Sequence, residues 1–241
     1  MGNESGVWIM HGIRESSPDC IHSSDELIEY IRKVGFLPLF RNEVSGFSVE
    51  EHTSPYYWWT GNEEKDPWEW RRILAESKQV VYGKFFNRKA GFLSLDYLPY
   101  FANWRRNGYD FDVLWDDQKA SYREKKIMDC FEEKKEIFSY ELRNTAGFGK
   151  TGEKNFEGTV TSLEMRLYLV NSDFRQRRNK YGFPYGWHIA VYAMPESLWG
   201  YDTVTSAYEE EPETSGSRIW DRMRQLYPDA SEEQIRQILK F

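Results

Sequence analysis

Cysteine and histidine are scarce in this chain of 241 residues, which contains two cysteines and four histidines. Cys20 and Cys130 lie far apart in the sequence and provide no disulfide framework, as is usual in a reducing compartment. No two histidines have the i,i+4 spacing of zinc ligands on a helix. We therefore expect a cytoplasmic protein that holds no metal.

Long apolar runs and the motifs of common cofactor enzymes are also missing. No stretch approaches the roughly 18 apolar residues that span a bilayer, and the first residues lack the pattern of a secretory signal. A glycine-rich phosphate loop, a Gly-x-Ser-x-Gly elbow, a kinase set and a metalloprotease motif do not occur either. The sequence predicts no cofactor and no membrane partner, and it leaves open whether the protein is an enzyme.

The net charge of −7 is unevenly distributed along the chain. Residues 121–193 contain 13 Lys and Arg against 10 Asp and Glu, whereas the rest of the chain contains 19 against 29. A mildly basic segment therefore lies within an acidic protein. This distribution argues against nucleic-acid binding by the whole surface and leaves room for a local site.

Residues 1–120 are expected to form an α+β lobe, which could be a first winged-helix-like unit. Helix starts are predicted by three N-cap signals, namely Ser23 with Glu26, Ser48 with Glu51, and Asp66 followed by Pro67. Two β-rich runs, 80–86 and 91–94, predict a hairpin joined by residues 87–90. A further helix is predicted over residues 97–106.

Residues 121–195 are expected to form a winged-helix-like unit. Three helices are predicted first, over about 122–135, over 139–146 and from Phe156 onward, the last with an apolar stripe. Two β-rich runs, 167–170 and 187–192, follow and flank a polar segment predicted as a loop. Three helices followed by a two-stranded wing is the order of a winged helix. The predicted fold class is therefore α+β and mostly helical, with short hairpin wings.

Residues 196–241 are expected to form an acidic loop and a helical tail. Residues 209–213 hold four glutamates and predict the loop. Two helices follow, over 218–226 and after a capping box at Ser231 and Gln234, and each has one apolar face.

Four basic side chains lie in the polar segment of the predicted wing: Arg175, Arg177, Arg178 and Lys180. A guanidinium cluster on a protruding segment favours contact with phosphate. Arg166 is predicted on the outer face of the preceding helix, but Glu157 and Glu164 share that face and disfavour sequence-specific groove recognition. DNA is the expected partner, and a solvated basic turn is the alternative.

A second candidate site is a block of aromatic residues that holds four of the ten tryptophans between residues 58 and 70. The rings of Trp58, Trp59 and Trp68 could stack on a flat ligand whose polar edge Arg71 holds. Alternatively, the rings could belong to the core, with Asp66 acting only as an N-cap.

A third candidate is the pair Asp110 and Asp112, which could converge on one site in an extended segment. Such a pair could perform acid–base chemistry. The alternative is that both carboxylates form ion pairs with Arg105 and Arg106. No other catalytic residue is identified from the sequence.

Several segments of the chain resemble bacterial proteins called AlkZ-related. These segments are GFLPLF at 35–40, GFSVEE at 46–51, WTG at 59–61, DPWEWR at 66–71, YGKFF at 82–86, FANWRRNGYD at 101–110 and YGW at 185–187. The resemblance covers about residues 25–195 and implies a relation to winged-helix DNA glycosylases, which excise alkylated or cross-linked bases. The Gln-x-Gln-type catalytic motif of those enzymes does not occur in this chain. The resemblance therefore implies a shared fold and a nucleic-acid-related ancestry rather than a shared activity.

Three hypotheses about function follow. The protein could be a nucleic-acid-binding module without catalytic activity. It could be a glycosylase-like DNA repair enzyme that uses a carboxylate such as Asp110 or Asp112. It could also be a small-ligand or protein-interaction module built on the tryptophan block.

Overall fold

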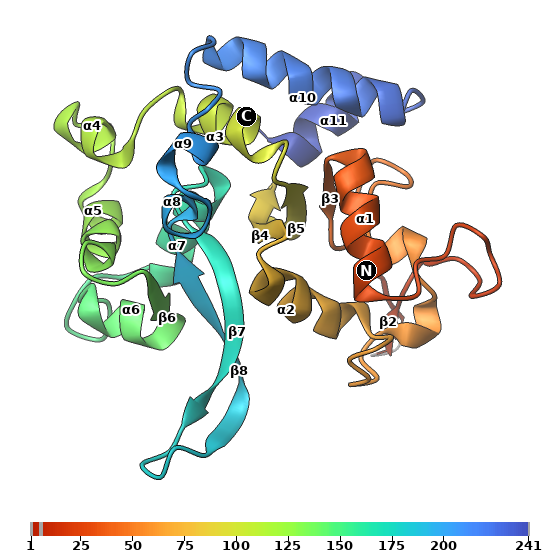
Figure 1. Ribbon diagram of the computed structural model, residues 1–241, viewed down its shortest axis with the longest axis horizontal. Coiled ribbons are helices and arrows are strands. Elements are labelled where there is room, and N and C mark those ends of the chain that lie inside the picture. Colours follow the sequence, from red (N-terminus) through yellow and green to blue (C-terminus); the bar gives the residue numbers. More distant parts are fainter. Residues whose placement is uncertain (1, 5–6, 241) are drawn as a thin grey trace. The chain divides into compact units, whose positions relative to one another are not determined.

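The computed structural model describes residues 2–4 and 7–240, and the chain divides into two compact units (Figure 1). Unit 1 consists of residues 1–98 and 216–241, and unit 2 of residues 99–215. These units differ in extent from the three expected segments 1–120, 121–195 and 196–241, whose independence as domains stays a prediction. The expected mixture of helices and strands is confirmed, and the strand pairs are antiparallel.

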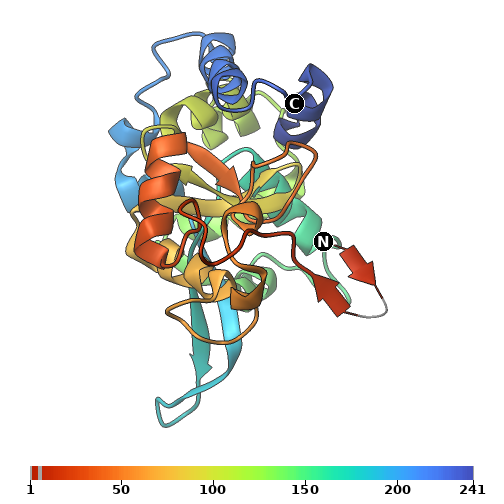
Figure 2. The same cartoon turned by 90° about the vertical axis from the view of Figure 1, so that its right-hand side faces the viewer.

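Unit 1 contains short strands, helices and single 3-10 turns. Its elements are β1 (Gly2–Glu4), β2 (Val7–Ile9), α1 (Ser24–Val34), β3 (Phe36–Pro38), η1 (Glu50–His52), η2 (Pro55–Tyr57), α2 (Pro67–Ser77), β4 (Val80–Phe86), β5 (Lys89–Ser94), most of α10 (Pro212–Leu226), and α11 (Glu232–Leu239). Strands β3, β5 and β4 are neighbours in that order, and α1 packs beside them (Figure 2).

Two of the three capped helix starts predicted for unit 1, at Ser23 and at Asp66, are confirmed. The Ser23 hydroxyl accepts from the Glu26 amide, and the Asp66 carboxylate accepts from the Trp68 amide. After α1, Gly35 has a φ of 97°, and a Cβ there would lie 2.6 Å from the Tyr97 ring. Glycine is therefore required both by the backbone conformation and by the close ring.

Other unit 1 elements differ from the prediction in their limits. The helix expected after Ser48 is a single 3-10 turn, η1. The turn between β4 and β5 consists of two residues, Asn87 and Arg88, rather than four. Both have positive φ, as a tight type I′ hairpin turn requires.

Unit 2 contains most of the helices and one long hairpin. Its elements are α3 (Leu98–Arg106) from its second residue onward, α4 (Phe111–Asp116), α5 (Tyr122–Met128), η3 (Asp129–Phe131), β6 (Glu136–Phe138), α6 (Ser139–Thr145), α7 (Phe156–Met165), β7 (Val170–Arg178), β8 (Pro184–Ala193), α8 (Pro195–Trp199) and α9 (Tyr201–Val204). Within this unit β8 pairs with both β7 and β6.

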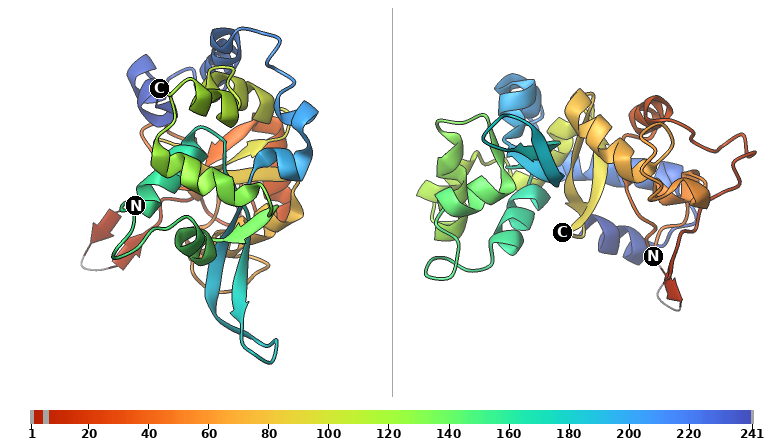
Figure 3. Two further views of the ribbon diagram at one scale, coloured as in Figure 1. Left: turned by 90° about the vertical axis from the view of Figure 1, so that its left-hand side faces the viewer. Right: turned by 90° about the horizontal axis from the view of Figure 1, so that it is seen from below.

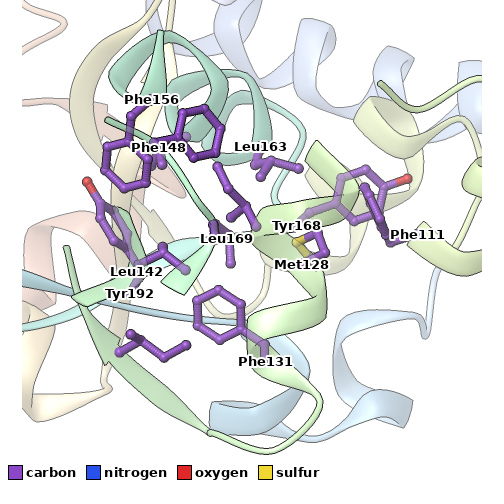
Figure 4. Close-up of a cluster of buried hydrophobic side chains, with 14 of the residues drawn as sticks. Phe111, Met128, Phe131, Leu142, Phe148, Phe156, Leu163, Tyr168, Leu169 and Tyr192 are labelled. Atoms are coloured by element: carbon purple, nitrogen blue, oxygen red, sulfur yellow. The ribbon is translucent and has the colours of Figure 1, made fainter. Parts of the chain in front are cut away.

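The helix predicted over 122–135 is too long, because α5 ends at Met128 and a single 3-10 turn, η3, follows it before the chain forms β6. Phe131 and Ile137 are both buried in one apolar cluster, which also contains Leu163 and Tyr192 (Figure 4). A continuous helix would rotate residue 137 by about 240° from residue 131 at about 100° per residue. The chain instead ends α5 at Met128 and returns to the core as the strand β6.

The prediction of a loop for the polar segment of the wing is wrong. This segment forms most of β7 and the start of β8, and only residues 179–183 make the turn. The strand predicted over 167–170 begins only at Val170. Leu167 has a φ of 57°, and its amide donates to the Glu164 carbonyl, so it ends the preceding helix.

The C-terminal part also departs from the prediction. Helix α10 begins at Pro212, within the expected acidic loop, and proline is favoured in the first helical turn. The short helices α8 and α9 were not predicted. The capping box at Ser231 and Gln234 is confirmed at the start of α11.

Candidate functional site

The hairpin formed by β7 and β8 extends beyond the helices of unit 2 (Figure 1 and the left panel of Figure 3). Its turn is organised by Asn179, whose side-chain oxygen accepts from the amides of Tyr181 and Phe183. The Asn179 amide in turn donates to the Phe183 carbonyl. These bonds give the tip a defined conformation although its side chains face solvent.

The four basic residues predicted for this segment all lie on the hairpin, but they are not equivalent. Arg175 forms ion pairs with Glu136 and Asp173. Arg177 stacks over the Tyr140 ring at 4.3 Å, Arg178 donates to the Gly182 carbonyl at 2.9 Å, and Lys180 lies over the Tyr181 ring. Within the part of the chain that the structure describes, no carboxylate pairs with Arg177, Arg178 or Lys180. Three cations on the outer hairpin are therefore available to an external anion.

Sequence reasoning missed four aromatic residues on the same hairpin. Their exposed fractions are 72% for Tyr181, 68% for Phe183, 48% for Tyr185 and 91% for Trp187. The signal was present in the sequence, because an aromatic residue occurs at every second position from 181 to 187. That alternation is typical of a strand, but it was overlooked because the segment was interpreted as a polar loop.

Arg166, the fifth basic residue of the predicted site, has a different partner from the hairpin cations. It follows the last residue of α7 and forms an ion pair with Glu124, the N3 residue of the α5 capping box. Burial disfavours the charged form of Glu124, but the Arg166 charge and hydrogen bonds from Ser121, Arg166 and Ser162 outweigh it and lower the carboxyl pKa. Glu164, expected beside Arg166 on an exposed face, is fully buried and accepts from Asn171.

The tryptophan block forms a cluster of rings in unit 1. Trp58 is buried and donates its indole N–H to Thr53, whereas 41% of Trp59 is exposed. Phe40 joins the rings of Trp58 and Trp68, with centroids 5.5 and 6.3 Å away. Arg71 stacks 3.5 Å above the Trp68 ring. These contacts hold the rings of the block together, and the partly exposed Trp59 lies at the surface of the cluster.

Asp110 and Asp112 are brought together in unit 2, where both line a pocket of about 340 Å³. Its apolar side includes Phe111, Met128 and Phe131. Asp110 accepts a hydrogen bond of 2.7 Å from the Tyr201 hydroxyl.

The neighbouring Arg106 binds a carboxylate that the sequence did not indicate. Its guanidinium is buried and donates to Glu196, 90 residues away, at 2.5 Å. Burial disfavours the charged arginine, but Glu196 and the Tyr208 hydroxyl reverse this effect and raise its pKa.

A larger pocket of about 1050 Å³ lies in unit 1 and was not predicted. Tyr30 and His52 line it, and the Tyr30 hydroxyl lies 2.9 Å from His52 Nε2. Burial raises the pKa of Tyr30 to about 12. Its walls carry both carboxylates and cations, which gives no preference for a ligand of one charge.

Among residues 2–4 and 7–240, no group of three or more His, Cys, Asp and Glu side chains is arranged to hold a metal ion. No helix in this part of the chain combines the length and the apolar character of a membrane span.

The fold and the hairpin together define a mixed helix–strand protein that presents a basic, aromatic surface. The sequence profile of the family described as AlkZ related matches residues 21–240, and the chain belongs to this family. The match confirms the resemblance inferred from the sequence and extends it into the C-terminal helices. The family suggests a protein related to DNA-repair glycosylases. No match is found among curated proteins or among solved structures.

Proposed function

We propose that this protein binds nucleic acid through the β7–β8 hairpin, with residues 121–195 acting as a winged-helix-like unit. The order of elements supports this proposal. Helix α5, strand β6, helices α6 and α7, and strands β7 and β8 follow one another, and β8 pairs with both other strands. The hairpin is then the wing of the unit. Unit 1 has a similar order, with α1, β3, α2, β4 and β5.

The observation that carries the proposal is the set of cations without carboxylate partners on the outer hairpin. Arg177, Arg178 and Lys180 are exposed and lie within four residues of one another. The protein as a whole is acidic, so a phosphate backbone would be repelled from most of its surface and attracted here. Phosphate contacts of this kind position a protein without selecting a sequence.

Helix α7 contributes less to the proposed interface. Thr159, Thr161 and Glu164 are buried, and Arg166 is engaged by Glu124. A recognition helix needs exposed donors and cations along the side that enters the major groove. We therefore propose contact with the nucleic-acid backbone rather than base-specific recognition in the groove.

Fluorescence anisotropy with a labelled DNA duplex at about 50 mM salt tests the proposal. Replacing Arg177, Arg178 and Lys180 together by alanine is expected to weaken binding at least about tenfold. A matched variant replaces three exposed cations elsewhere, Arg14, Lys89 and Lys134, and changes the net charge equally. Binding by this control within about twofold of the parent supports a local site. An equal loss in both variants, or no binding by the parent at low salt, contradicts the proposal.

A second candidate function is base excision in the unit 2 pocket. It is favoured by one observation, that Asp110 and Asp112 line the same pocket, which has an apolar side. A base-release assay on alkylated DNA with Asp110→Asn and Asp112→Asn tests it. A catalytic carboxylate is expected to account for about 100-fold or more of the rate. Unchanged release in both variants excludes these two residues.

A further inference from the structure

The outer hairpin exposes apolar rings that no element of its own unit covers. Trp187 is almost fully exposed, and Tyr181 and Phe183 expose more than two thirds of their surface. A hydrophobic patch at the tip of a projecting hairpin is unfavourable in water unless a partner covers it. Contacts with phosphate do not account for these exposed rings, so a further binding partner that covers them is needed.

We propose that the hairpin selects nucleic acid that contains unpaired bases, on whose faces Tyr181, Phe183, Tyr185 and Trp187 stack. This inference rests on the proposed function and names its substrate class. It adds base stacking, a contact with a different energetic origin, to the phosphate contacts.

The cations of β7 and the rings of β8 lie on opposite strands of the hairpin and meet across the ladder and at the turn. Arg177 lies directly opposite Tyr185 in the ladder, so the two side chains share a face of the hairpin. Lys180 precedes Tyr181 at the turn and lies over its ring. Cations that follow a phosphate backbone, combined with rings on which successive bases stack, are the two parts of a single-strand binding surface.

The strand pairing of the hairpin is irregular next to Trp187. The register shifts between Arg175 and Arg177, and two extra residues on β8 are accommodated around Gly186. Gly186 has a φ of 77°, and its carbonyl accepts from the Gln176 side chain at 2.7 Å. Bulges of this kind redirect a neighbouring side chain. Trp187 directly follows Gly186 at this irregularity, and its side chain is 91% exposed.

Base pairing decides which form of nucleic acid can use these rings. In an intact duplex each base is stacked on its neighbours, so that mainly its edges are accessible in the grooves. An aromatic side chain can stack only on a base whose face is open, as in a single strand, a gap or an unstacked site. Stacking is also tolerant of sequence, which agrees with a surface that carries few base-reading groups.

The test compares three labelled probes: a single strand of about 16 nucleotides, the matching duplex, and a duplex with a short gap. The parent protein is expected to bind the single strand and the gapped duplex about tenfold more tightly than the intact duplex. Trp187→Ala with Phe183→Ala is expected to remove most of this preference while duplex binding stays within about twofold. Trp187→Phe, which retains a stacking ring, is expected to keep most of the preference.

Tyr56→Ala is the matched control, because Tyr56 is 88% exposed and lies in unit 1. It is expected to change binding to none of the probes. Equal binding of all probes by the parent, or a preference that is unchanged in the variant without the Phe183 and Trp187 rings, overturns the stacking inference and leaves the phosphate contacts standing. Absence of binding to every probe at low salt overturns the proposed function as well. Ring-dependent binding to anionic lipid vesicles without any preference for unpaired bases also overturns the inference, in favour of a membrane surface.

Discussion

The ion pair between Arg106 and Glu196 ties α3 to α8 within unit 2, and its disruption is expected to destabilise the protein. The Arg106 side chain is 1% exposed and also donates to the Leu167 carbonyl at 2.5 Å. Removing one partner of a buried pair leaves an uncompensated charge and costs about 3–5 kcal/mol. Because Leu167 and Tyr208 still accept from Arg106, Glu196→Ala should fall at the lower end, at about 3 kcal/mol.

Substitutions of different severity at Glu196 and Arg106 separate the contribution of the charge from that of side-chain packing. Glu196→Gln keeps an acceptor for the guanidinium and should cost about 1–2 kcal/mol. Replacing both residues by apolar side chains, with Arg106→Met and Glu196→Leu, should cost less than the sum of the two single changes. The assay is urea unfolding of the full chain followed by circular dichroism. A cost below about 1 kcal/mol for Glu196→Ala, or strict additivity in the double variant, would refute the reasoning.

Three further predictions concern individual groups. Because the pKa of Glu124 is lowered from 4.5 in the folded protein, its charge stabilises the fold above that pH, and the stabilisation is lost as the pH falls through the folded pKa. Glu124→Gln should therefore lower the free energy of unfolding, measured by urea titration, by about 2 kcal/mol at pH 7 and by progressively less below about pH 4.5. A loss of stability that does not depend on pH contradicts a stabilising role of the Glu124 charge. Asp66→Ala leaves the amides of Gly61 and Trp68 without their buried acceptor and should cost about 2 kcal/mol by thermal unfolding, whereas Asp66→Asn should cost less. Burial raises the pKa of the Cys20 and Cys130 thiols, so both should react with iodoacetamide at about pH 8 more slowly in the folded protein than in urea; equal rates contradict it.

Helix starts could be predicted from the sequence because their causes are local. The hydroxyl of Ser23 and the carboxylate of Asp66 satisfy amides two or three residues ahead, so the pattern and the structure lie within one turn. The same holds for the capping box at Ser231. Each of these starts is confirmed.

The strands of unit 2 could not be delimited in this way. Strand β6 exists because Ile137 pairs with Tyr192, more than fifty residues later, and nothing near Ile137 indicates that partner. The outer part of β7 carries mainly charged side chains, since both of its faces meet solvent there, and it therefore resembled a loop. Local patterns favour strands only where one face is buried.

In the candidate site, too, features with local causes could be predicted and features that depend on tertiary contacts could not. The basic residues of the β7–β8 hairpin were predicted because their spacing is visible in the sequence, and they lie on one hairpin. The contacts that separate Arg175 from Arg177 come from Glu136 and Tyr140, which lie on other elements of unit 2. The partner of Arg106 is likewise Glu196 rather than the nearby Asp110, a choice that only tertiary packing determines.

The salt dependence of nucleic-acid binding tests the hairpin interface most directly. Three phosphate contacts on a single strand predict that log K falls with log salt with a slope of about −2, which is about 16-fold weaker binding between about 50 and 200 mM salt. Removing Arg177, Arg178 and Lys180 together should bring this slope close to zero. The same slope in the parent protein and in the triple variant would contradict the assignment of the interface to this hairpin.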